Sequence, residues 1–129
     1  MFIPHTWQNQ SEPWDLQPVK AGIALEPGVA MMASGGVLVK ATGANMPTHI
    51  CMEKVANTES GQMIHVETVR GETEYVTELS VASASIAVGA KYTIDANGEK
   101  ITATTEGGVA TVTAFDGTTA GSKVYVRFC

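Results

Sequence analysis

The sequence predicts an all-β fold, a small barrel or β-tulip-like sandwich of short antiparallel strands with an extended N-terminal arm and little helix. Three observations support this class. Gly, Thr, Val and Ala recur along the chain while Leu is scarce, a balance that favours strands over helices. Short apolar runs alternate with glycine turns at regular spacing, which is typical of barrels and sandwiches. No convincing amphipathic helix pattern occurs, and the 129 residues fit one domain.

The first strands of the predicted β domain, residues 20–129, follow turn signals. The run Ser34-Gly35-Gly36 is a turn signal, and residues 35–43, GGVLVKATG, then form one arm of a hairpin. Residues 47–56 begin a further strand after a proline. Side chains alternate between the two faces of a strand, so Ile50 and Cys51 are expected on opposite sides.

The remaining strands are expected to follow one another through tight turns. Residues 62–79 give two strands on either side of Arg70-Gly71-Glu72, and Asn97-Gly98 is a strong hairpin signal. Residues 109–115 and 123–128 form the closing pair of strands. Residues 80–89 are read as a loop or one short helical turn.

Residues 1–19 differ from the rest of the chain and are predicted to form an extended arm. They hold three of the five prolines, which disfavour helix and deny amide donors to the interior of a sheet. They also hold large apolar side chains, which are rare in disordered tails and need a surface to cover them, either on this domain or on a partner. The candidate anchors are Phe2, Ile3, Trp7, Trp14 and Leu16.

Charge and composition argue against several classes of partner and location. The net charge is −5 and the pI is about 5.0, with Lys and Arg scattered, so nucleic acid is not an expected partner. No apolar run of about 18 residues and no signal peptide is visible, so no membrane association is expected. Cys51 and Cys129 are expected to be reduced thiols, as in a protein made in the cytoplasm.

The residues that most resemble a reactive site are His49 and Cys51, with His65 on a neighbouring strand. A structural zinc site usually draws on close cysteine pairs, and none is present, so no metal is expected. A nucleophilic cysteine needs a stabilised thiolate and an oxyanion hole, and neither is indicated here. The acidic residues of the 62–79 hairpin are interpreted as the solvated face of a strand. The glycines match no phosphate-binding motif. The sequence thus predicts a protein that is not an enzyme and carries no cofactor.

Residues 20–128 resemble the capsid decoration, or cement, proteins of tailed bacteriophages, of the lambda-like head decoration type. The most specific pieces are LVKATG followed by PTHI-x-M, then ETEY, and finally DGT with AG-x-KVYVRF. The resemblance implies a structural virion protein, made in the bacterial host cytoplasm, that binds the exterior of the assembled capsid and stabilises the expanded head. Its partners would be the major capsid protein and two further copies of itself, in a trimer at three-fold positions.

Among lambda-like members an extended N-terminal arm adds a strand to a capsid protein sheet, which fits an arm at residues 1–19. Buried tryptophans often dominate interfaces, so Trp7 and Trp14 would act as anchors. A different virion β-module, such as a head fibre base or a tail-associated adhesion domain, is the alternative. A small hydrolase or metal-binding barrel is a third possibility, which only His49, Cys51 and His65 support.

Overall fold

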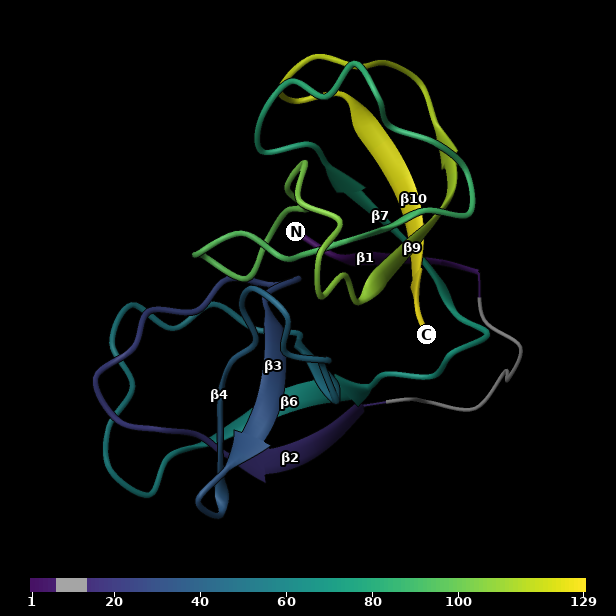
Figure 1. Cartoon of the computed structure of the whole chain (residues 1–129). Helices are drawn as coiled ribbons and strands as arrows, with labels where there is room; N and C mark the ends of the chain where they lie inside the picture. Colours follow the sequence, from purple (N-terminus) through teal and green to yellow (C-terminus); the bar gives the residue numbers. More distant parts are fainter. Residues whose placement is uncertain (7–13) are drawn as a thin grey trace.

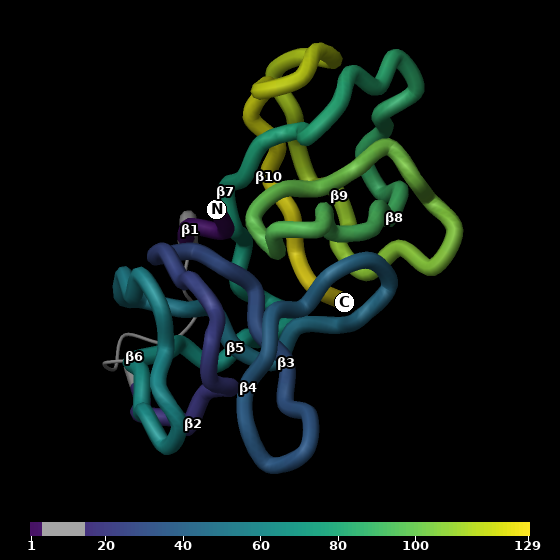
Figure 2. The backbone as a smooth tube through the Cα atoms, turned by 90° about the vertical axis from the view of Figure 1, so that its left-hand side faces the viewer, coloured from purple at the N-terminus to yellow at the C-terminus, as the bar shows by residue number. Residues whose placement is uncertain are grey.

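The computed structural model describes residues 1–6 and 14–129, which form two antiparallel sheets of five strands each. Sheet A has the order β1-β7-β10-β9-β8, and sheet B has the order β2-β6-β5-β3-β4. Both views place the strands of sheet A on one side of the molecule and those of sheet B on the other (Figures 1 and 2). The strands are β1 (Ile3–Thr6), β2 (Trp14–Pro18), β3 (Ala30–Ser34), β4 (Val37–Lys40), β5 (His49–Cys51), β6 (Met63–Thr68), β7 (Glu74–Glu78), β8 (Lys91–Tyr92), β9 (Ala110–Phe115) and β10 (Lys123–Phe128).

The predicted all-β class is confirmed, and the architecture is a sandwich in which neither described sheet closes into a barrel. The described ranges contain no helix that is long and apolar enough to cross a membrane.

The β3–β4 hairpin shows how local sequence sets the register of sheet B. Ser34 pairs with Val37, which leaves a two-residue turn of Gly35 and Gly36. Both glycines have positive φ angles, 61° and 84°, as a type I′ turn requires. The predicted Gly-Gly turn and the strand after it are therefore confirmed.

Sheet B curls so that its two edge strands approach each other. Val19, directly after β2, forms a parallel bridge with Leu38 of β4, and the Lys20 amide donates to the Leu38 carbonyl at 2.9 Å. The concave face of the curled sheet encloses a second, smaller apolar cluster. This cluster comprises Val19, Leu25, Val29, Met31, Leu38, Cys51, Ile64 and Val66.

The main core lies between the sheets and contains an aromatic group. The rings of Phe2 and Phe128 meet edge to face with centroids 5.0 Å apart, and Tyr75 lies 5.4 Å from Phe128. Ile50 joins this core from sheet B, whereas Cys51 points into the second cluster. The predicted alternation across β5 is thus correct, and both of its faces are buried because sheet B is covered on each side.

The predicted hairpin around Asn97-Gly98 is present but is less regular than a two-strand ladder. Within residues 91–105 only Lys91–Tyr92 forms a strand, which pairs with β9, and beyond it Ile94 and Ile101 form an isolated bridge. The turn is nevertheless closed, because the Asp95 amide donates to the Lys100 carbonyl at 2.9 Å. Residues 80–89 contain no strand and no helix, in agreement with the loop interpretation.

The N-terminal segment contributes one edge strand to each sheet. β1 pairs with β7 in sheet A, and β2 pairs with β6 in sheet B. Figure 1 shows the two strands on different layers of the molecule. The extended conformation predicted for the described parts of residues 1–19 is therefore present. The described parts of this segment pair with residues 20–129, because an extended strand beside an open sheet edge gains backbone hydrogen bonds.

Candidate functional site

The predicted anchors of the N-terminal segment differ in their environments: one is buried, two are exposed, and two have side chains outside the described part. Phe2 is fully buried in the main core, so it holds this segment to its own domain and is not accessible to a partner. Ile3 and Leu16 are exposed by 57% and 48%. Trp7 lies outside the described residues, and Trp14 begins β2 with a side chain that is also outside the described part.

Leu16 lies beside a second exposed apolar side chain, that of Met63. In the β2–β6 ladder Leu16 is opposite His65, and Pro18 is opposite Met63. Residues opposite each other in an antiparallel pair share one face of the sheet, so Leu16 and Met63 are diagonal neighbours on the same face. Met63 is 49% exposed. At Glu67, farther along β6, sheet A covers this same face. Leu16 and Met63 therefore lie on the part of the face that sheet A leaves uncovered.

Ile3 borders the same region through Met52. The Met52 amide donates to the His65 carbonyl at 2.9 Å, which places Met52 next to the strand that carries Met63. Met52 and Ile3 also line one apolar hollow of about 250 Å³, together with Met1, Phe2, Pro27 and Gly28. We call Ile3, Leu16, Met52 and Met63 the apolar strip; the exposed side chain of His65 lies between Leu16 and Met52 on this face. Methionines adapt their shape to a partner, so such a strip is suited to protein contact.

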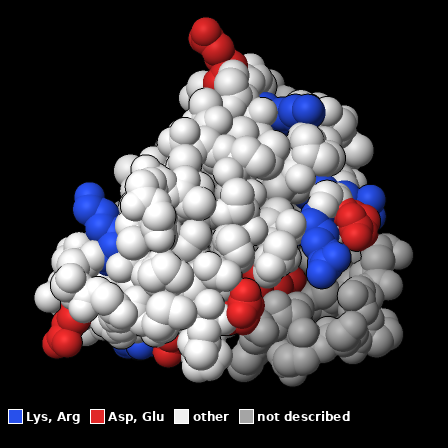
Figure 3. Space-filling view, turned by 90° about the horizontal axis from the view of Figure 1, so that it is seen from below, with Lys and Arg blue, Asp and Glu red and all other residues white. Residues whose placement is uncertain are grey.

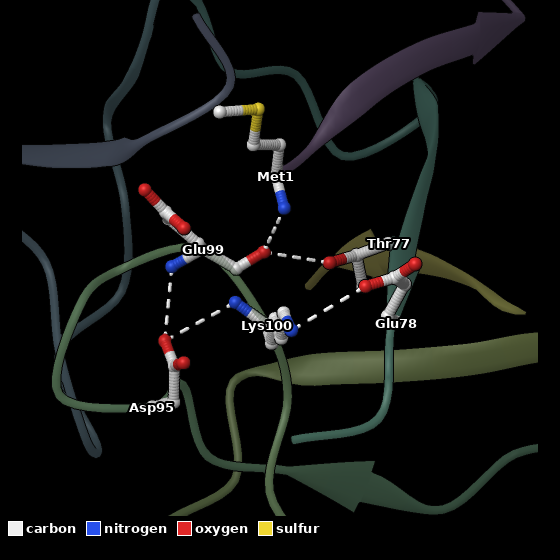
Figure 4. Close-up of polar contacts among 6 residues, drawn as sticks. All are labelled: Met1, Thr77, Glu78, Asp95, Glu99 and Lys100. Carbon is white, nitrogen blue, oxygen red and sulfur yellow. Dashed lines mark hydrogen bonds and ion pairs between the residues drawn. The ribbon is translucent and has the colours of Figure 1, made fainter. Parts of the chain in front are cut away.

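A second hollow, of about 280 Å³, lies on the other side of Ile3, over sheet A. The Glu99 carbonyl accepts hydrogen bonds from the Met1 ammonium and from the Thr77 hydroxyl, the latter at 2.7 Å (Figure 4). Lys100 Nζ lies 3.4 Å from a Glu78 carboxylate oxygen. Burial lowers the pKa of the Met1 ammonium, and the charge of Glu99 opposes this effect most strongly. These contacts fix the start of β1 and thereby the position of Ile3.

A turn that the sequence places correctly carries two of the residues that line this second hollow, Glu99 and Lys100. One Asp95 carboxylate oxygen accepts the Glu99 and Lys100 amides at 2.9 and 3.1 Å, which shapes the loop that carries both residues (Figure 4). An aspartate that binds backbone amides a few residues ahead is a common turn device.

The residues that most resembled a reactive site are not brought together. Cys51 is fully buried, its thiol donates to the Glu53 carbonyl at 3.0 Å, and burial raises its pKa. His65 is exposed, with Nδ1 3.6 Å from Glu53 Oε1. Burial lowers the pKa of His49, and nearby Asp15 opposes this effect. Within the described ranges, no three His, Cys, Asp or Glu side chains are grouped as metal ligands.

The interpretation of the acidic residues as a solvated face is wrong for Glu67. This side chain is 1% exposed on β6, between the sheets, where it faces the fully buried Tyr75 of β7. Burial and, after it, the Glu67 carboxylate raise the pKa of Tyr75. The alternation of β6 puts Glu67 on the face opposite Ile64 and Val66, and the sequence gives no sign that a second sheet covers that face at Glu67.

Met52 and Met63 are the residues of the apolar strip that sequence reasoning missed. The alternation of β6 already assigns Met63 to the same face as His65, opposite the buried Ile64. An apolar side chain on a face assigned to solvent was the available signal. Met52 carried no such signal, because alternation places it on the same face as the buried Ile50, and it is itself half-buried against the main core.

The end of the molecule that carries β2 and the β3–β4 turn is poor in charge. Seen from below Figure 1, it shows a broad area without charged side chains, and most Lys, Arg, Asp and Glu side chains lie toward the margins (Figure 3). Depletion of charge at the centre is a property of protein interfaces.

Comparison with known proteins leaves the geometry as the main guide to function. No family model matches the chain, and no curated protein matches it either.

Proposed function

We propose that the protein is a structural head protein that binds the exterior of an assembled bacteriophage capsid and stabilises the expanded shell. The observation that carries the proposal is the apolar strip, in which Ile3 shares a hollow with Met52 and Leu16 is the diagonal neighbour of Met63. A small β-sandwich with such a strip is suited to binding a protein surface. The resemblance of residues 20–128 to decoration proteins supplies the partner, which is the major capsid protein.

The stabilising mechanism is mass action. A protein that binds only the expanded lattice lowers the free energy of that lattice and so opposes its disassembly. We propose that three copies act together at a three-fold position. Three linked contacts reinforce one another through effective concentration, so each contact can be weak.

The contact is made through side chains and not through an added strand at β1. The outer edge of β1 offers few donors, because the Phe2 amide already donates to the Gly28 carbonyl at 2.7 Å and Pro4 has no amide hydrogen. Edge strands with blocked donors resist pairing with further strands. The strip therefore replaces the strand addition that the resemblance implies for an extended arm.

The test uses expanded shells assembled from the major capsid protein encoded in the same genome. Ile3→Asp and Leu16→Asp are each expected to weaken cosedimentation by roughly 30-fold, since burying a charge at an interface hot spot costs about 2 kcal/mol or more. Val88→Asp is the matched control, because Val88 is 64% exposed and lies outside the strip. Unchanged binding of both strip variants would overturn the strip as the contact surface. Binding of the parent protein to tails or fibres, but not to shells, would favour the alternative virion β-module.

A further inference from the structure

The outer edge of β2, which faces away from β6, has its backbone amide donors blocked or already bonded. The Val19 amide donates to the Gln62 carbonyl of the β6 side at 3.1 Å. Backbone groups of successive strand residues point to opposite edges, so Asp15 and Gln17 also face β6. Leu16 and Pro18 therefore turn their backbone groups away from β6.

Each outward position between residues 16 and 20 lacks an available donor. The Leu16 amide donates to Asp15 Oδ1 at 2.8 Å. Pro18 has no amide hydrogen. The Lys20 amide is used by the Leu38 carbonyl at 2.9 Å. Of these three positions, only Leu16 is closed by a side chain that a single substitution can remove.

The closing side chain is itself held in place. Gln17 Nε2 donates to Asp15 Oδ2 at 2.9 Å, so the two oxygens of one carboxylate are bound by its two following residues. The hydrogen bonds from Gln17 and then from Leu16 lower the pKa of the Asp15 carboxyl, so it stays charged. A charged side chain over an edge amide is one of the means by which natural sheets avoid edge-to-edge pairing.

We propose that Asp15 is a guard that prevents β2 from pairing with β2 of a second copy of this chain. Leu16 lies ahead of the Val19–Leu38 bridge by which β4 meets this edge, and in an antiparallel pair centred on Leu16 each Leu16 amide would donate to the Leu16 carbonyl of the other copy. Leu16 is also 48% exposed, so pairing would cover its side chain as well. The Asp15 carboxylate occupies the amide that this pairing needs. The inference concerns assembly through β2, and its test does not involve the capsid, although pairing would also cover the Leu16 side chain of the apolar strip.

The test compares the assembly states of single variants by sedimentation velocity over a range of concentrations. Asp15→Ala is expected to raise the association constant roughly 30-fold above that of the parent, the size expected when two backbone hydrogen bonds become available per dimer. Asp15→Asn keeps an oxygen that can accept from the Leu16 amide, so it is expected to behave as the parent does. Association of Asp15→Asn equal to that of Asp15→Ala would contradict the proposal, because the hydrogen bond to the Leu16 amide would then not be what prevents pairing.

A second variant ties the association to the Leu16 amide. Combining Asp15→Ala with Leu16→Pro removes the donor itself, and this outward position on an edge strand tolerates proline. The double variant is expected to return to the assembly state of the parent. Persistent association of the double variant, or an Asp15→Ala variant that sediments as the parent does, would contradict the proposal.

Discussion

Replacing Phe2 by Ala tests whether the N-terminal segment is part of the core. Phe2 has no exposed surface, and its ring meets Phe128 edge to face at 5.0 Å. Replacement of a buried Phe by Ala costs about 3–5 kcal/mol, of which an aromatic pair contributes about 0.5–1.5 kcal/mol. We expect a loss of about 3 kcal/mol, at the low end, because Phe2 immediately precedes an edge strand that can partly close the cavity.

Thermal unfolding followed by circular dichroism measures this loss. For a chain of 129 residues, about 3 kcal/mol corresponds to a fall in Tm of roughly 10 °C. Ile3→Ala is the matched control, because Ile3 is 57% exposed and should lose about 1 kcal/mol or less. If the Phe2→Ala variant had the same Tm as the Ile3→Ala control, Phe2 would not be packed in the main core, contrary to the structure.

Three further predictions concern packing and protonation. Gly28→Ala should destabilise the protein more than Gly22→Ala. Both glycines have positive φ, which costs about 1–2 kcal/mol for alanine, but only at Gly28 would the new Cβ lie 2.5 Å from the Cβ of Met1. Equal losses of unfolding free energy in urea would contradict this prediction. Because the pKa of Tyr75 is raised on folding, the contribution of its neutral phenol to stability is complete below about pH 10 and is lost as the pH rises further. In a series of unfolding free energies measured against pH, Tyr75→Phe should lose less stability above about pH 10 than the parent does. An equal loss in both proteins would count against this prediction. A thiol reagent should modify the exposed Cys129 in the native protein but the buried Cys51 only after unfolding, and rapid labelling of both thiols would be inconsistent with the structure.

Much of the fold could be predicted because its signals are local. A Gly-Gly turn with both φ angles positive fixes the register of β3 against β4, and Asn97-Gly98 marks a turn that closes as expected. Alternation assigned Ile50 and Cys51 to opposite faces. Which strands join which sheet is not a local property, so the division of the chain into two sheets did not follow from the pattern.

The candidate site was only partly predictable for the same reason. Composition identified the N-terminal segment as one that needs a surface, but it could not separate Phe2, which the chain buries itself, from Ile3 and Leu16, which remain exposed. The burial of Glu67 likewise depends on how the second sheet packs over β6. Side-chain type predicts that a residue needs a partner, whereas tertiary packing decides whether that partner lies within the same chain.

An electron cryomicroscopy map of expanded shells incubated with the parent protein tests the proposed function most directly. We expect density at three-fold positions on the capsid exterior, with the apolar strip, marked by Ile3 and Leu16, against the capsid protein. Leu16→Asp should remove that density and Val88→Asp should leave it. Bare shells after incubation with the parent protein, or density in which the strip faces solvent, would contradict binding of the capsid through the strip.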